Sequence, residues 1–168
     1  QVGVLRRVLA TPTPAWQVVV GLGAGWMAVA LLQSLIIVTI GAVAFGVGWG
    51  DPLAATLLVV AFAADGTGAG LLLGGLGGNE DGVGARPPVV GLVLGALGGC
   101  MTPIEVFPPA LVRVANAIPH YWALRAWRTL IFDGGGLADI VASLVILAGV
   151  AVALVGAAGV VLRRDLTG

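Results

Sequence analysis

The first residue with the potential for chemistry is Asp65, the one charged side chain in an otherwise apolar stretch from Pro52 to Gly78. A carboxylate in the middle of a transmembrane helix costs roughly 2.5–3.5 kcal/mol, so its presence there calls for a reason. One interpretation is a proton or cation site, or part of a polar path for a substrate. The other is a structural acid, either protonated or hydrogen-bonded to neighbours such as Thr67 or Gln33.

Gln33 is a second polar residue within a long apolar stretch. An amide at membrane depth commonly forms a hydrogen bond that holds two helices together. Contact with a substrate is the alternative role for this side chain.

A third polar group combines Glu105 with two arginines, Arg125 and Arg128, which lie three positions apart and so share one face of a helix. Trp122 and Trp127 flank them, which is typical of side chains anchored at the lipid headgroups. The functional alternative is a gate in which the arginines pair with Glu105 or Asp133.

The composition excludes several kinds of chemistry. One Cys (Cys100) and one His (His120) cannot build a zinc site alone. Without any Lys, the chain can hold neither a phosphate-binding Walker loop nor a Schiff base. Its net charge of zero leaves no basic surface for nucleic acid. We therefore expect no catalytic residue, cofactor or metal, a packing role for Cys100 and a structural role for His120.

Long stretches without charge predict the fold. Only 10% of the 168 residues are charged, whereas soluble proteins are about one quarter charged. Because a run of ~20 apolar residues crosses a bilayer as a helix, we expect an all-α polytopic transmembrane helix bundle formed by one domain over residues 1–168. The predicted spans are residues 16–47, 53–76, 89–101 and 138–162, after a stretch at 1–15 that lies outside the membrane.

Two further segments differ from the spans. Residues 77–88 are charged and glycine-rich, which predicts a loop. Residues 102–136 contain four prolines interleaved with aromatic residues and arginines, which prevents one continuous helix. We expect two half-helices there, at about 110–117 and 121–132, forming a re-entrant pair before the last span.

The arginines predict the orientation of the chain. Alternating crossings place five arginines on one side and three on the other, which favours the cytoplasm for the five and for both ends of the chain. The five are Arg6, Arg7, Arg86, Arg163 and Arg164, and the three are Arg113, Arg125 and Arg128. The protein is expected in the plasma membrane, in contact with lipid.

Glycines repeat every four residues in three of the spans. Such ridges lie on one helix face and allow close approach of two helices in lipid. They predict close packing between the spans at 53–76 and 89–101. The glycines are Gly21 and Gly25 in the first span, Gly66, Gly70 and Gly74 in the second, and Gly91, Gly95 and Gly99 in the third.

Three sequence blocks resemble the permease subunit of ABC-2 type transporters, a family that includes drug, lipid and polysaccharide exporters. Residues 7–12 fit a cytoplasmic R-x-x-x-T-P stretch, and residues 16–47 are similar to the third span of the family. Residues 98–108, GGCMTPIEVFP, follow a G-G-x-x-x-P-x-E-x-x-P block, and IPHYWAL at 118–124 follows it before the final span. The resemblance begins at the third span, so two more spans are expected before Gln1. Asp65 departs from the family pattern.

The resemblance implies a transport subunit rather than an enzyme, working as a homodimer or heterodimer of permeases with cytoplasmic ABC ATPase subunits. Residues Arg6, Arg7, Thr11 and Pro12 would then couple the permease to its ATPase. The translocation path or gate would include Gln33, Asp65, Glu105, Arg125 and Arg128. Two alternatives remain open: a membrane-embedded enzyme acting on lipid-linked substrates with Asp65 or Glu105 as its acid, and a proton-coupled secondary transporter using Asp65.

Overall fold

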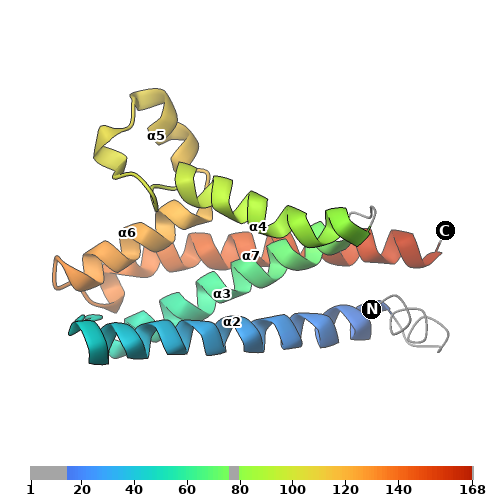
Figure 1. Cartoon of the computed structure of the whole chain (residues 1–168), viewed down its shortest axis with the longest axis horizontal. Coiled ribbons are helices and arrows are strands. Elements are labelled where there is room, and N and C mark those ends of the chain that lie inside the picture. Colours follow the sequence, from blue (N-terminus) through green and yellow to red (C-terminus); the bar gives the residue numbers. More distant parts are fainter. Residues whose placement is uncertain (1–14, 76–79, 168) are drawn as a thin grey trace.

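The protein is helical throughout the part of the chain that the structure describes (Figure 1). The structure is a computed structural model, and it describes residues 15–75 and 80–167. Its elements are α2 (Ala15–Phe45), α3 (Pro52–Gly75), α4 (Glu80–Leu97), a 3₁₀ turn η1 (Ile104–Val106), α5 (Pro109–Ala115), α6 (Pro119–Ile131) and α7 (Leu137–Thr167).

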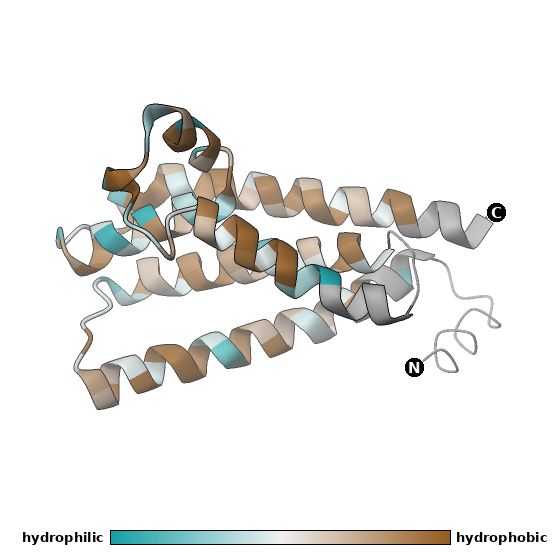
Figure 2. Ribbon diagram, turned by 45° about the horizontal axis from the view of Figure 1, so that its top comes forward, coloured by the Kyte–Doolittle hydropathy of each residue, from teal (hydrophilic) through white to brown (hydrophobic). Residues whose placement is uncertain are grey.

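Three of these helices are long and apolar enough to cross a membrane. They supply apolar segments at Val20–Phe45, Pro52–Gly75 and Leu137–Val161, of 24 to 26 residues each. At about 1.5 Å per residue, each segment exceeds the ~30 Å hydrocarbon core of a bilayer. These segments coincide with three of the predicted spans. Figure 2 shows that hydrophobic residues dominate the long helices, whereas hydrophilic residues gather mostly at the end where α6 lies.

The α4 helix differs from its prediction. The expected loop at 77–88 is wrong from Glu80 onward, because α4 begins there and continues through Pro87 and Pro88. The glycines predicted a loop through their low helix propensity, but this propensity is a weak preference that tertiary packing overrides, and α4 packs against α3 and α6. The apolar part of α4 is short, Arg86–Leu97, and turns follow at 98–103. A fourth full crossing therefore stays a prediction.

A tight turn between α2 and α3 sets these two helices antiparallel. The Asp51 carboxylate accepts a hydrogen bond from the Ala54 N–H at 2.9 Å and caps α3, while Pro52 supplies a first helical residue that needs no donor. Gly50 has a φ of +75°, and a Cβ there would collide with the Leu130 carbonyl oxygen of α6. Only glycine satisfies both constraints, so this turn can lie directly against α6.

The central contact of the bundle joins α3 and α7. Both helices run in the same direction, with α6 against them and α2 beside α3 (Figure 1). Buried residues from the three central helices form one core, consisting of Ala54, Ala55, Leu58, Ala123, Ala126, Leu130, Ile140 and Leu147. Most of them are alanine or leucine, which lets the helices pack closely where lipid offers no hydrophobic drive for association.

The glycine ridges do not play their predicted role. Gly66, Gly70 and Gly74 of α3 and Gly91 of α4 have open space where a side chain would lie, and the main partner of α3 is α7 rather than α4. The α3 and α4 helices do contact each other, as predicted, but less extensively than α3 and α7, and without close packing over these four glycines. A four-residue period identifies a helix face, but not the helix that covers it.

The close approach occurs instead at Gly68, a glycine outside the ridge. A Cβ at this position would lie 2.9 Å from the Leu154 Cβ and 3.3 Å from the Val155 backbone nitrogen. Gly68 is buried, and because it has no side chain, α7 can approach α3 closely at this position.

We expect Gly68→Ala to destabilise the bundle. Overlap in a packed helix contact costs about 1–3 kcal/mol, which exceeds the helix-propensity gain of up to about 1 kcal/mol for replacing glycine. The free energy of unfolding of the full chain in detergent should fall. The matched control is Gly66→Ala, two residues away in open space, which should be neutral or stabilising. Equal stability of the two variants would contradict the α3–α7 contact.

Candidate functional site

Prolines position the two short helices that follow α4. Pro109 and Pro119 each occupy the first turn of a helix, where a missing N–H is harmless, and extended residues precede them. The resulting helices, α5 and α6, correspond to the predicted half-helices at 110–117 and 121–132. They begin one and two residues earlier than predicted. Whether the pair re-enters the membrane stays a prediction.

The α6 helix has two different faces. Ala123, Ala126 and Leu130 are buried in the core shared with α3 and α7. Arg125 and Arg128 lie on the exposed side. A short helix of this kind presents a fixed row of polar groups, because its apolar face determines its rotation.

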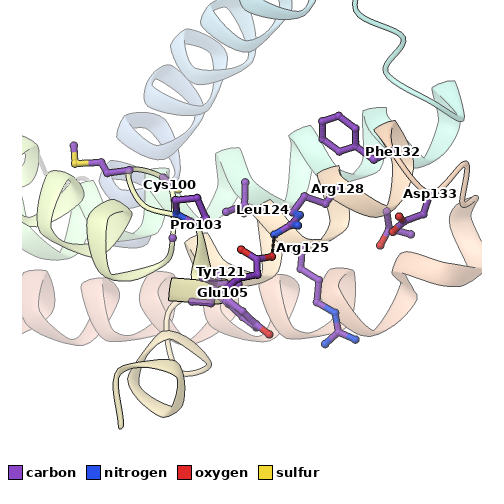
Figure 3. Close-up of a pocket in the computed structure, with 13 residues that line it drawn as sticks. Cys100, Pro103, Glu105, Tyr121, Leu124, Arg125, Arg128, Phe132 and Asp133 are labelled. Atoms are coloured by element: carbon purple, nitrogen blue, oxygen red, sulfur yellow. Dashed lines mark hydrogen bonds and ion pairs between the residues drawn. The ribbon is translucent and has the colours of Figure 1, made fainter. Parts of the chain in front are cut away.

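A groove of about 980 Å³ lies along the polar side of α6, between that helix and the segment 99–105 (Figure 3). Apolar side chains line part of it, and charged or hydroxyl-bearing side chains line the rest. The apolar set includes Met101, Ile104, Leu124 and Phe132, and the polar set includes Glu105, Tyr121, Arg125, Arg128, Thr129 and Asp133. The volume is within the usual range of small-molecule sites.

An ion pair crosses the groove. Arg128 donates a hydrogen bond to the Glu105 carboxylate at 2.5 Å, and both side chains are about half exposed. A hydrogen bond from its own backbone N–H, and then the Arg128 guanidinium, lower the pKa of Glu105 below its ordinary 4.5. The pair ties η1 to α6 through two residues that are 23 positions apart in sequence.

The other arginine has a different environment. The Arg125 guanidinium lies 5.5 Å from the centre of the Trp122 ring, and Trp122 in turn donates its indole N–H to the Asn116 carbonyl at 2.8 Å. In Figure 3, Arg125 points away from Glu105. Of the two arginines that the sequence singled out, only Arg128 pairs with the acid.

Asp65 lies apart from this groove. It is 3% exposed, and neither carboxylate oxygen has a hydrogen-bond partner within the described part of the chain. The predicted hydrogen bonds to Thr67 or Gln33 are wrong, because Thr67 donates to the Met27 sulfur at 3.8 Å and Gln33 lies on an exposed face of α2. Neighbours in sequence, or at equal membrane depth, need not face one another.

The remaining predicted residues fall into three groups. Arg6, Arg7, Thr11 and Pro12 lie outside the described residues. Cys100, predicted in helix packing, is instead exposed in the turn after α4 and lines the groove. His120 is partly buried, its ring centre lies 5.1 Å from that of Phe62 in an edge-to-face contact, and burial lowers the pKa of this imidazole. The ring packs against Phe62, and its Nδ1 has no hydrogen-bond partner within the described part of the chain, so a structural role for His120 stays a prediction.

The sequence analysis missed two polar members of the groove, Tyr121 and Thr129. Both lie at helical spacing from Arg125, at four residues before and after it. That spacing places all three on one side of α6 and was the signal that could have found them.

The comparison with protein families decides the identity of this fold. The profile of the ABC-2 type transporter family matches residues 1–132, about four fifths of the chain. The chain belongs to the ABC-2 type transporter family. The match includes α2 to α6 and ends before α7. Searches among curated proteins and among solved structures found no match.

Membership agrees with the three apolar helices and makes this chain a multi-pass membrane protein and a transport component rather than an enzyme. Permeases of the ABC-2 family work in general with ABC ATPase partners. The groove on α6 lies within the matched region except for Asp133, and Gln33, Asp65 and Glu105 lie within it as well.

We expect the Glu105–Arg128 pair to open in acid. Because the folded pKa of Glu105 is lowered, the contribution of the pair is complete above pH 4.5 and is lost as the pH falls through the folded pKa. The amide hydrogen exchange of residues 103–107, corrected for the intrinsic rate, should accelerate as the pH falls through the folded pKa of Glu105. In the Glu105→Gln variant these amides should exchange fast at every pH. In the Asp133→Asn variant their exchange should still accelerate in acid. A pH-independent exchange rate in the unmodified protein would contradict the contact.

Proposed function

We propose that this chain is the membrane-spanning subunit of an ATP-driven exporter that forms the path for a drug-like, lipid or polysaccharide substrate. Family membership is the observation that carries the proposal. The absence of Lys supports this proposal, since a Walker loop needs Lys and residues 1–168 supply none. The complex would contain two permeases, identical or different, and two cytoplasmic ATPase subunits.

The arrangement of the helices supports a topology for this complex. The α2 helix begins at the same end of the bundle at which α7 ends (Figure 1). We assign that end to the cytoplasmic face of the plasma membrane, as the arginine distribution favours. The stretch 1–15, with Arg6, Arg7, Thr11 and Pro12, would then dock the ATPase, because charged residues and helix breakers suit a soluble partner.

The opposite end carries the proposed gate. There α5 and α6 would form the re-entrant pair on the outer face. Of the two predicted pairings, Glu105 with Arg125 or with Arg128, the contact between Glu105 and Arg128 supports the second as the polar contact of the gate. A groove with an ion pair across it can open when that pair breaks, at modest energetic expense because both side chains are half exposed. Non-helical backbone at such a depth must face water or be covered by protein, which suits a position above a pathway.

Gln33 and Asp65 are the proposed polar positions within the path. A buried carboxylate without a hydrogen-bond partner is expensive in an apolar bundle, so Asp65 is unlike a residue kept for packing. Its burial also favours the second candidate function, proton-coupled transport, in which Asp65 would bind and release the proton. These two functions differ in their dependence on ATP and on pH.

The topology can be tested with single cysteines in a Cys100→Ser background, because native Cys100 is exposed. In intact cells a membrane-impermeant thiol reagent should leave a cysteine at Arg7 unlabelled. A cysteine at Gly48, in the turn between α2 and α3, should be labelled from outside and is the matched control. Labelling at Arg7 from outside would overturn both the orientation and the proposed ATPase contact.

Export in inside-out vesicles at matched expression tests the path and the gate together. We expect Asp65→Asn to reduce ATP-dependent transport severalfold while expression stays equal or rises, because the substitution removes a buried charge. Glu105→Ala should also reduce transport, since it removes the partner of Arg128. Wild-type rates for both variants would contradict the assigned roles. Transport driven by a pH gradient without ATP, and lost in Asp65→Asn, would favour the secondary transporter.

A further inference from the structure

The groove on α6 has a charge pattern that the gate leaves unexplained. Its lining includes two arginines and two acids, so its net charge is zero. Arg128 and Glu105 neutralise one another. In the part of the chain that the structure describes, Arg125 and Asp133 make no ion pair. One guanidinium and one carboxylate thus remain open along a single groove.

Arg125 is held in position before any ligand arrives. Its guanidinium lies against Trp122, and the Trp122 ring is fixed by a hydrogen bond to the Asn116 carbonyl. Tyr121, one helical turn before Arg125, extends to the same side of α6 in Figure 3. A guanidinium next to a phenol hydroxyl offers several convergent donors, which suits a phosphate group.

Asp133 provides the opposite charge at the end of α6. It follows Arg125 by eight positions, which is about 12 Å at the rise of a helix, and long side chains reduce that separation for a ligand that lies between them. Asp133 is exposed and lines the groove close to Phe132. A carboxylate accepts hydrogen bonds and donates none at neutral pH, so its ligand should be a cation with N–H groups.

Apolar side chains complete the groove. Leu124 and the largely exposed Met101 and Phe132 lie beside the charged residues. Tryptophan and tyrosine on the same helix favour the boundary between acyl chains and headgroups. The ligand should therefore join a small zwitterionic head to hydrocarbon, and the bilayer supplies such molecules at high local concentration.

We propose that this groove binds a zwitterionic glycerophospholipid of the surrounding membrane, one with a primary ammonium group. Its phosphate contacts Arg125 and the Tyr121 hydroxyl, its ammonium contacts Asp133, and its hydrocarbon lies along Leu124 and Phe132. A net neutral groove gives no advantage to an anionic lipid. A quaternary ammonium has no N–H to donate, and the Trp122 face that would attract it is already covered by Arg125.

The test measures lipid binding to the purified full chain by native mass spectrometry, so it depends on neither transport nor an ATPase. Phosphatidylethanolamine, its N-methyl and N,N-dimethyl derivatives and phosphatidylcholine form a graded series. Affinity should fall along it, with about a tenfold difference between the ends, as expected when charge-assisted hydrogen bonds are lost. Equal affinities, or tighter binding of phosphatidylglycerol, would overturn the proposal.

Variants then test which of the two charged residues contacts the phosphate and which contacts the ammonium group. Asp133→Asn should abolish discrimination between phosphatidylethanolamine and phosphatidylcholine while phospholipid binding persists. Arg125→Gln should weaken both lipids about tenfold, and Arg125→Lys should restore part of the loss. Arg113→Gln, on α5 outside the groove, is the matched control and should bind like the unmodified protein. Unchanged binding in Arg125→Gln and Asp133→Asn would refute the site. If Arg125→Gln fails to fold, Arg125→Lys and the methylation series still decide.

Discussion

Close packing of α3 on α7 is the constraint on which the rest of the structure depends. In lipid, two apolar helices gain little from leaving their solvent, so their association relies on contact between complementary surfaces. Gly68 allows this contact because Leu154 and Val155 occupy the space that a side chain would take. Nearer the start of α3 and α7, alanines, leucines and an isoleucine form the core on which α6 lies.

The polar features of the protein follow from that arrangement. With its apolar side on the core, α6 presents Arg125 and Arg128 to the groove, and the glycine turn at Gly50 keeps its far end in place. Arg128 binds Glu105 across the groove, so the chain between them is closed into a loop of fixed geometry. Asp65 belongs to a separate region, buried on α3 without a hydrogen-bond partner. An exporter built in this way would have a polar groove at its outer end and a buried acid, Asp65, at membrane depth.

Much of the fold was accessible from the sequence, because its causes are local. Charge-free stretches longer than a bilayer is thick predict helices, and three of them exist with bounds close to those expected. Prolines at 108, 109 and 119 end and begin helices through their own ring geometry, so two short helices could be anticipated before the last span. Three sequence blocks, including the one around Glu105, indicated the family, which the match over residues 1–132 confirmed.

The sequence by itself therefore determined most of the helices, the membrane class and the family, because these depend on composition and on near neighbours in the chain. It did not determine the first part of α4, which was expected to be a loop. Only the tertiary structure decided which surfaces meet. The close contact with α7 lies at Gly68 and not at the regular ridge of Gly66, Gly70 and Gly74. The partner of Glu105 is Arg128 and not Arg125. The tertiary structure also left Asp65 without the partners proposed for it. The reason is physical: a periodic pattern defines a helix face, but the rotation of each helix is set by the packing of all its neighbours.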